Sequence, residues 1–221
     1  MLGKLIVFEG IEGSGKTTQI QSLQEWLRAG EGLEILSQEA MIPQVVVTRE
    51  PGGTAIGQHL RQLLLTGMGT EEAIQDRTEL LLYAADRAQH VEGFLKPLLQ
   101  QGTWILCDRY IDSTVAYQGY GRGLDLDLIH QLNGIATGGL QSDLTLWLDL
   151  EVEQGLTRTR QRGDLDRIEQ ADLSFHQRVR QGYRALAQAS PDRRVAIDAS
   201  PGPSIVAQQI QATLKEYLRQ W

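Results

Sequence analysis

A glycine-rich segment near the N-terminus has the residues needed to bind phosphate. Residues 10–17 read Gly-Ile-Glu-Gly-Ser-Gly-Lys-Thr and match the pattern G-x-x-x-x-G-K-[ST] at every fixed position. In such a loop the backbone N–H groups point at nucleotide phosphates, and the N-terminus of the following helix adds partial positive charge. A glycine turn that merely caps a helix would not need this complete match. The expected ATP contacts in this segment are Gly10, Ile11, Glu12, Gly13, Ser14, Gly15, Lys16, Thr17 and Thr18.

Two residues of this loop and one later aspartate are expected to act directly on the phosphates. Lys16 should bridge the β- and γ-phosphates, and Thr17 should hold Mg²⁺. Asp108 follows the apolar run 104–107, a place where an aspartate often lies on the metal side of a bound nucleotide. An aspartate there can equally cap a helix or a turn, so its role as a metal ligand stays open.

Two arginines follow apolar runs in a way that suits a second phosphate. Arg49 comes after residues 45–48, and Arg109 comes after the run that Asp108 ends. Arginines at neighbouring strand ends can fork-bind one dianionic phosphate. Each arginine alone could also be only a salt-bridge partner.

Four arginines lie within ten residues and form the densest cluster of cations in the chain. Gly163 should break the helix before it, so residues 157–169 are expected to form a mobile lid. A solvated helix face is the alternative. Arginine donors over a transferring phosphoryl group can raise its rate by on the order of 10³–10⁵. We expect Arg162, ahead of Arg158, to act at the γ-phosphate and Arg160 to contact ATP; the fourth arginine is Arg167.

These residues must be positioned by an α/β fold. Five short apolar runs are typical of buried parallel strands, and segments with helical spacing separate them. The sequence therefore predicts a three-layer P-loop domain over residues 1–221, with a five-stranded parallel sheet whose first strand is central. Ligands bind such a sheet at the carboxyl ends of its strands. The expected strands are Leu5–Phe8, Val45–Thr48, Trp104–Cys107, Leu144–Leu150 and Val195–Ile197.

Composition narrows the possible functions. The chain has 221 residues and a net charge of −7, with a pI of about 5.1, which disfavours general binding of nucleic acid or anionic membranes. Its one cysteine, Cys107, excludes an internal disulfide and a cysteine-rich metal site. The sequence has neither a signal peptide nor an apolar stretch long enough for a membrane span, so a cytoplasmic location is expected. Residues 31–43 resist assignment.

The motifs together resemble the thymidylate kinases. The first, residues 8–19, is common to many P-loop proteins, whereas 48–54 (Thr-Arg-Glu-Pro-Gly-Gly-Thr) and 108–110 with 116–119 are much more specific to this family. Residues 83–87 (Tyr-Ala-Ala-Asp-Arg) and 166–169 (Asp-Arg-Ile-Glu) complete the set. The resemblance implies a nucleoside monophosphate kinase fold, transfer of the γ-phosphoryl group of ATP to dTMP with Mg²⁺ in dTTP synthesis, and a homodimer.

The resemblance also implies roles for individual residues. Arg49 and Arg109 would grip the acceptor phosphate, Tyr83 would pack on thymine, and Arg87 would hydrogen-bond a thymine carbonyl. Tyr117 would crowd the sugar 2′ position. Most family members carry Phe at the position of Tyr83. Further residues placed at the acceptor by the same comparison are Glu12, near the sugar 3′-hydroxyl, and Ser113, Thr114 and Gln118.

The phosphate loop indicates a branch of that family. Some thymidylate kinases carry an arginine at the position of Gly13, whereas this chain has glycine there and arginines in the expected lid. It thus resembles the bacterial branch in which the lid supplies the catalytic arginine. Glu12 inside the loop is unfavourable beside phosphates, which indicates a hydroxyl or metal partner for it.

No general base is needed for an acceptor phosphate, because its second pKa of about 6 leaves it largely dianionic near neutral pH. Only His90 lies near a motif, and we expect all four histidines to be surface or structural: His59, His90, His130 and His176.

Three alternatives remain. The chain could act on another nucleoside monophosphate, or on a deoxynucleoside with Glu12 as base. It could also be a regulator that binds ATP without turnover, although a switch does not need four arginines at the phosphates. A GTPase is disfavoured, because residues 108–111 lack the glycine of D-x-x-G.

Overall fold

The computed structural model describes residues 3–29, 31–32, 44–66, 72–163 and 166–221, so most of the unassigned segment 31–43 lies outside the described residues. Five parallel strands form one sheet in the order β2-β3-β1-β4-β5. All five expected strands are confirmed, as is the central position of the first. Their bounds are β1 (Leu5–Glu9), β2 (Val45–Arg49), β3 (Trp104–Asp108), β4 (Leu144–Asp149) and β5 (Arg194–Asp198).

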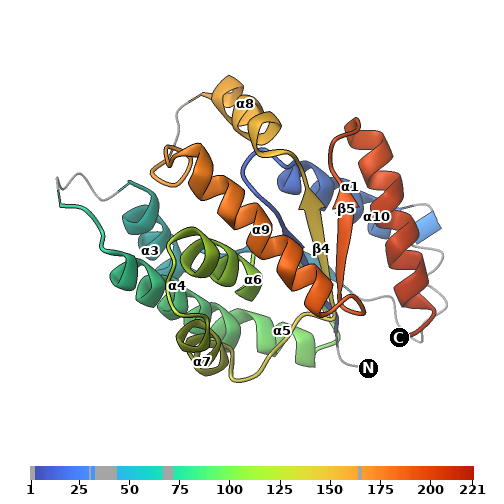
Figure 1. The fold of residues 1–221 in the computed structure, drawn as a ribbon. Helices are drawn as coiled ribbons and strands as arrows, with labels where there is room; N and C mark the ends of the chain where they lie inside the picture. The colour runs from blue at the N-terminus through green and yellow to red at the C-terminus, as the bar shows by residue number, and fades with distance from the viewer. Residues whose placement is uncertain (1–2, 30, 33–43, 67–71, 164–165) are drawn as a thin grey trace.

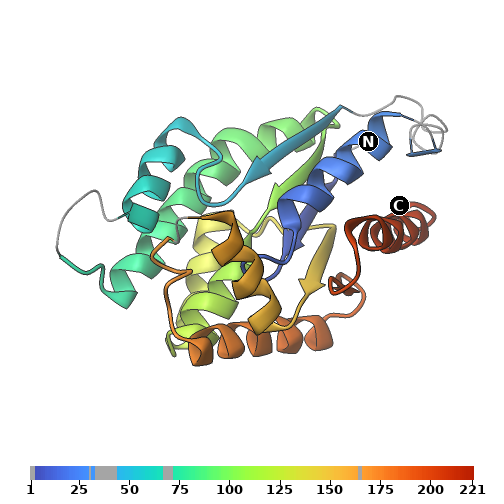
Figure 2. The same ribbon diagram turned by 90° about the horizontal axis from the view of Figure 1, so that it is seen from above.

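Helices cover both faces of the sheet (Figures 1 and 2). Apolar residues recur at helical spacing in residues 20–27, 56–64, 128–135 and 205–218, and these segments are confirmed as the helices α1, α3, α7 and α10. Helix α9 was not expected from such spacing. The helices are α1 (Lys16–Arg28), α3 (Ala55–Thr66), α4 (Asp76–His90), α5 (Lys96–Gln100), α6 (Ile111–Thr114), α7 (Leu126–Thr137), α8 (Val152–Arg162), α9 (Leu173–Ala189) and α10 (Pro203–Leu218), with π-helical turns η2 (Val91–Leu95) and η3 (Val115–Gly121).

The central strand shows why the sheet must have two covered faces. All five residues of β1 are buried, and neighbouring side chains of a strand point to opposite faces. Ile6 and Phe8 belong to the core that includes α1 and α10, whereas Leu5 and Val7 belong to the core beneath η2 and α5. A run without polar alternation is therefore the natural sequence for this position.

The register of the strands brings their carboxyl ends to one edge. Phe8 of β1 is paired with Asp108 of β3, and Asp108 is paired with Arg49 of β2. The phosphate loop leaves β1 at this edge and leads into α1. Within the described ranges, no helix is both long and apolar enough to span a membrane.

Helix α9 packs against η3 and along β4 and β5. It begins at an N-cap, Asp172, whose side chain accepts a hydrogen bond from the Phe175 N–H at 2.7 Å. Its buried residues Phe175, Val179 and Tyr183 recur every fourth position. That spacing is a visible helix signal, and the helix delivers Tyr183 and His176 to the carboxyl edge of the sheet.

Candidate active site

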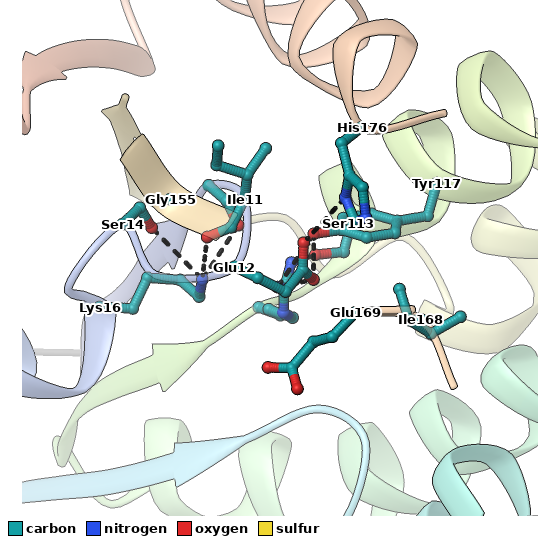
Figure 3. Close-up of polar contacts among 12 residues, drawn as sticks. Ile11, Glu12, Ser14, Lys16, Ser113, Tyr117, Gly155, Ile168, Glu169 and His176 are labelled. Atoms are coloured by element: carbon teal, nitrogen blue, oxygen red, sulfur yellow. Dashed lines mark hydrogen bonds and ion pairs between the residues drawn. The ribbon is translucent and has the colours of Figure 1, made fainter. Parts of the chain in front are cut away.

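The phosphate loop owes its shape to three glycines. Gly10, Gly13 and Gly15 have φ angles of 141°, 70° and 91°, a region that side-chain-bearing residues rarely adopt. Lys16 opens α1 and donates from Nζ to the carbonyl oxygens of Gly10 and Ile11, both at 3.0 Å (Figure 3). Burial, followed by the nearby charge of Arg109, lowers the pKa of Lys16 to about 8.

A cavity of about 520 Å³ opens beside this loop, and most expected site residues line it. Gly10, Ile11 and Ser14 do not line the cavity, and Arg160 is exposed outside it. The side chain of Arg162 lies outside what the structure describes, so its expected role at the γ-phosphate stays a prediction. The expected residues that line the cavity are Glu12, Gly13, Gly15, Lys16, Thr17, Thr18, Arg49, Tyr83, Arg87, Asp108, Arg109, Ser113, Thr114, Tyr117, Gln118 and Arg158.

Arg109 stands at the centre of the cavity wall and is held by four side chains. Its Nη1 donates to Ser113 Oγ at 3.2 Å and to the Tyr183 hydroxyl at 3.1 Å. Its Nη2 donates to Glu12 Oε1 at 2.9 Å and to the Tyr117 hydroxyl at 3.1 Å. The backbone of Arg109 has a φ of 71°, the only positive φ of a non-glycine residue in the described ranges. Such a backbone is sustained only where the surrounding contacts fix it.

Two further arginines line the cavity near Arg109. Arg49 ends β2 and is exposed, and Arg61 reaches in from α3, where its Nη1 donates to the Pro51 carbonyl oxygen at 3.0 Å. Burial and then the charge of Arg49 lower the pKa of Arg61. Arg61 was not expected as a site residue, because in the sequence it lies among the leucines of an amphipathic helix.

Arg87 is buried and already has several partners. Its Nε donates to Glu50 Oε2 at 2.8 Å, and its Nη1 donates to Thr114 Oγ1 at 2.8 Å and to Asn133 Oδ1 at 2.7 Å. Its Nη2 donates to the Tyr110 carbonyl oxygen at 3.0 Å. A guanidinium has five N–H groups, so among the described residues one Nη2 N–H of Arg87 is left for a ligand.

Three neighbours of Arg87 also line the cavity, and two of them are hydrogen-bonded to other parts of the protein. Tyr83 is one helical turn before Arg87 in α4 and is half-buried in the cavity wall. Gln118 donates to Glu79 Oε1 at 2.8 Å. Asp86 was not expected: its Oδ1 accepts from the Gly52 N–H at 3.0 Å, and burial raises its pKa to about 6.

Glu12 is the loop's acidic residue, and its side chain points away from Lys16 towards Tyr117 and His176 (Figure 3). Its Oε1 accepts from the Tyr117 hydroxyl at 2.5 Å as well as from Arg109. Burial alone would raise the pKa of Glu12, but His176, Arg109, Lys16 and Tyr117 outweigh it and bring the pKa to about 2. Glu12 is therefore a stable carboxylate.

Asp108 offers an oxygen to a ligand. It ends β3 in the cavity wall, and its Oδ1 is buried without a hydrogen-bond partner among the described residues. Buried polar atoms usually have partners, so an orphaned carboxylate oxygen in a cavity indicates a ligand such as a cation. Thr17, in the first turn of α1, lines the same cavity.

One arginine of the expected lid reaches the phosphate loop. Arg158, in α8, points its Nη1 at the carbonyl oxygens of Gly13 and Ala199, at 3.5 and 3.4 Å. Helix α8 ends at Arg162, and Gly163 follows with a φ of 127°. The predicted end of the helix at this glycine is therefore confirmed.

Part of the expected lid, residues 164–165, lies outside the described residues. Of the other lid arginines, Arg160 is exposed and Arg167 is bonded to the Leu64 carbonyl oxygen and to Glu79. Among the described side chains of the lid, Arg158 is thus the arginine that reaches the phosphate loop.

The histidines divide into two exposed and two buried residues. His59 and His130 are exposed. His90 is buried as a structural residue between Thr48 and Glu50, bonded to their side chains at 2.8 and 2.9 Å. In the sequence only His90 lies near a motif, but the fold also buries His176 beside Glu12 of the phosphate loop. The chain folds α9 back onto the loop, which sequence distance conceals.

A phosphate loop that faces arginines across one cavity, at the carboxyl edge of a β2-β3-β1-β4-β5 parallel sheet, defines a P-loop nucleoside monophosphate kinase. Comparisons with known proteins narrow the class further. The sequence model of the thymidylate kinase family matches residues 8–210. A thymidylate kinase of a Cyanothece species is 61% identical over 228 residues, covering 100% of this chain and 97% of its own.

A second relative and a solved structure agree. A thymidylate kinase of Trichodesmium erythraeum is 58% identical, with 100% of this chain and 99% of its own covered. The crystal structure of thymidylate kinase from Ehrlichia chaffeensis superposes with a TM-score of 0.76 at 33% identity, over 97% of this chain and 100% of that one. The chain belongs to the thymidylate kinase family.

Proposed function

We propose that Arg49, Arg61 and Arg109 bind the phosphate of the acceptor while the phosphate loop binds ATP. The reaction is transfer of the γ-phosphoryl group of ATP to dTMP, giving dTDP and ADP. The observation that supports these roles is that three guanidinium groups line one cavity with the phosphate loop, and that Arg49 and Arg109 lie near enough to Arg61 to add to the effect of burial in lowering its pKa. Guanidinium forks match the geometry of a phosphate dianion.

The nucleoside of dTMP is assigned to the remaining acceptor-side residues. Tyr83 packs on the thymine ring, the unused N–H of Arg87 donates to a thymine carbonyl, and Tyr117 excludes a 2′-hydroxyl. Arg87 is held by four partners, so it offers one fixed donor rather than a flexible one. Such preorganised donors discriminate well, because a wrong base leaves them unpaired.

Catalysis then rests on position and charge. The acceptor phosphate is already a nucleophile near neutral pH, so no residue has to remove a proton. Arg158 is assigned to the γ-phosphate, because among the lid side chains that the structure describes it is the arginine that reaches the loop. Arginine donors there stabilise the charge that spreads over the equatorial oxygens during transfer.

A deoxynucleoside kinase is the alternative that shares most of this machinery. It would need a carboxylate to take a proton from a 5′-hydroxyl, and Glu12 is the candidate. A carboxylate whose pKa is about 2 is a poor base near neutral pH. Three arginines at the acceptor end would also have no phosphate to bind, so the monophosphate is favoured.

Mg²⁺ is assigned to the space between Thr17 and Asp108. The orphaned Oδ1 of Asp108 and the hydroxyl of Thr17 are hard oxygen donors of the kind that Mg²⁺ takes, together with nucleotide phosphates and water. When bound, the ion would neutralise charge on the β- and γ-phosphates. Asp108 and Thr17 are the residues of this chain that would hold the ion.

We also propose a cytoplasmic homodimer. The family resemblance implies it, and α3 and α4 pack side by side with apolar side chains on their outer surface. Ile56 is 56% exposed and Leu81 is 51% exposed. Sedimentation of Leu81→Glu beside the unchanged protein tests this: a shift to monomer supports the interface, and an unchanged mass places it elsewhere.

Arg49→Lys and Arg109→Lys test the acceptor assignment, since lysine keeps the charge but loses the fork. Each variant should raise the KM for dTMP by roughly tenfold or more and change the KM for ATP by less than about threefold. Arg184→Lys, on the outer face of α9, is the matched control and should change neither. Equal rises in both Michaelis constants would remove these arginines from the acceptor site.

A further inference from the structure

His176 lies beside Glu12 but does not itself line the cavity, and the roles above leave it without a task. It is the fourth residue of α9, and only 1% of it is exposed. Its Nδ1 lies 3.5 Å from Glu12 Oε2 (Figure 3), whereas Arg109 donates to the other oxygen of the carboxylate, Oε1. A histidine of α9 and a carboxylate of the phosphate loop therefore face each other without solvent between them.

The two atoms that face each other, Glu12 Oε2 and His176 Nδ1, have no hydrogen bond to any other described residue. Glu12 Oε2 and both ring nitrogens of His176 are shielded from solvent, and none has a hydrogen bond within the described ranges. Buried polar atoms are rarely left unpaired, because their lost hydration is not replaced. A shift of a few tenths of an ångström brings Nδ1 and Oε2 within ordinary hydrogen-bond distance.

The surroundings of Glu12 show why its second oxygen, Oε2, needs a hydrogen-bond donor. Oε1 already takes two donors, Arg109 and Tyr117, and Lys16 lies across the loop. Asp166 lies near enough to repel Glu12 electrostatically. Without a donor on Oε2, the carboxylate could turn and present either oxygen to the acceptor side.

We propose that His176 is a positioning residue for Glu12. Its Nδ1–H donates to Oε2 and thereby keeps Oε1 directed at Arg109, Tyr117 and the sugar hydroxyl of the acceptor. The sugar part of this inference rests on the proposed acceptor, dTMP, and on the place near its 3′-hydroxyl that the family resemblance implies for Glu12, whereas the contact itself does not. His176 touches neither nucleotide; it acts through Glu12 alone.

A packing role is the competing explanation. The ring of His176 lies 5.3 Å from that of Phe175 in an edge-to-face arrangement, as a core aromatic would. If packing were its only role, an apolar side chain of similar size would replace it without affecting the acceptor site. Donation from Nδ1 has a different consequence, because only a side chain with an N–H in that place can replace it.

Three variants separate these roles: His176→Leu fills the space without a donor, His176→Asn keeps an amide N–H near the position of Nδ1, and His130→Leu is an exposed control. His176→Leu should raise the KM for dTMP about tenfold, the value of one hydrogen bond to a charged group. The KM for ATP should stay within about twofold of the unchanged protein, and His176→Asn should restore most of the loss. A normal KM for dTMP in His176→Leu, or no rescue by asparagine, overturns the inference.

An acceptor without the 3′-hydroxyl links the effect to Glu12. The unchanged protein should prefer dTMP over 3′-deoxythymidine monophosphate, and His176→Leu should lose most of that preference. Equal rises in KM for both acceptors would mean that the cavity as a whole is disturbed, which contradicts a role through Glu12.

The contact is also measured directly, in the folded protein and without turnover. The ¹⁵N chemical shifts of the His176 ring in the unchanged protein should show a proton on Nδ1 in a hydrogen bond, and Glu12→Gln should move that Nδ1 signal. An unmoved signal overturns the inference even if dTMP is the acceptor. A protein that phosphorylates no dTMP overturns the proposed function, and the nitrogen shifts still decide whether His176 holds Glu12.

Discussion

The backbone of Gly13 lies directly against the backbone of Gly155. A β-carbon on Gly13 would lie 2.2 Å from the Gly155 carbonyl oxygen, and one on Gly155 would lie 2.5 Å from the Glu12 carbonyl oxygen. The phosphate loop and the helix that carries Arg158 therefore meet without a side chain between them. This contact explains the glycine at position 13: an arginine there would have to push α8 off the loop.

We predict that Gly155→Ala lowers kcat strongly. In an exposed helix the same change normally stabilises a protein by up to about 1 kcal/mol, but here the methyl group must separate α8 from the loop and move Arg158. A misplacement of about 1 Å at a catalytic group can cost about 100-fold in rate. Gly134→Ala in α7, where nothing lies within 4 Å, is the control. It should keep full activity, whereas full activity in Gly155→Ala would show that α8 does not have to rest on the loop.

Two variants of Tyr117 should separate its hydroxyl from its ring. Tyr117→Phe loses the bonds to Glu12 and Arg109 and should raise the KM for dTMP about tenfold. Tyr117→Ala also removes the ring and should reduce the preference for dTMP over ribothymidine 5′-monophosphate. The ratio of kcat/KM for these two acceptors is the measurement, and an unchanged ratio in Tyr117→Ala would exclude crowding at the 2′ position.

Glu9 should make stability depend on pH. Its carboxylate is fully buried and bonded to Ser113 Oγ at 2.6 Å and to the Tyr183 hydroxyl at 2.9 Å. Burial, and then the nearby Asp112, raise its pKa from 4.5 to about 7. The pKa of Glu9 is higher in the folded protein than in the unfolded chain, so protonated Glu9 stabilises the fold. Its contribution to the free energy of unfolding is fully present below pH 4.5 and is lost as the pH rises through about 7.

Urea unfolding at pH 5, 6, 7 and 8 tests this prediction. One pKa unit corresponds to about 1.4 kcal/mol, so the unchanged protein should lose about 3 kcal/mol relative to Glu9→Gln across this range. Glutamine does not ionise and so should remove this part of the pH dependence. Parallel stability curves for the two proteins would mean that Glu9 does not bind a proton in this range.

The sheet could be predicted because buried parallel strands are continuous apolar runs, and these stand out between helical segments. Asp108 and Arg109 could be predicted as site residues for a related reason: they follow a strand, and parallel strands end at one edge. Arg61 and His176 could not be predicted as site residues, because both lie on helices. Which residues a helical side chain contacts depends on how the helix packs in the folded protein. No spacing in the sequence shows that α9 lies against the phosphate loop.

The lid shows the same limit within a single helix. The sequence revealed a cluster of arginines but not which one approaches the loop. In the structure Gly155 rests on the loop, and Arg158 follows one helical turn later on the same face, which brings it to the Gly13 carbonyl oxygen. The contact between Gly155 and the loop thus determines which face of α8 meets the loop, and this contact cannot be read from the sequence.

We infer that the acceptor is a nucleoside monophosphate held by arginines, with dTMP preferred. Release of ADP should be measured with ATP, Mg²⁺ and, in turn, dTMP, dUMP, dCMP, dGMP, UMP and thymidine. Turnover should be fastest with dTMP and absent with thymidine. Turnover of thymidine would contradict it and make Glu12 a base, and a lack of turnover with every acceptor would indicate a protein that binds ATP without transferring its phosphate.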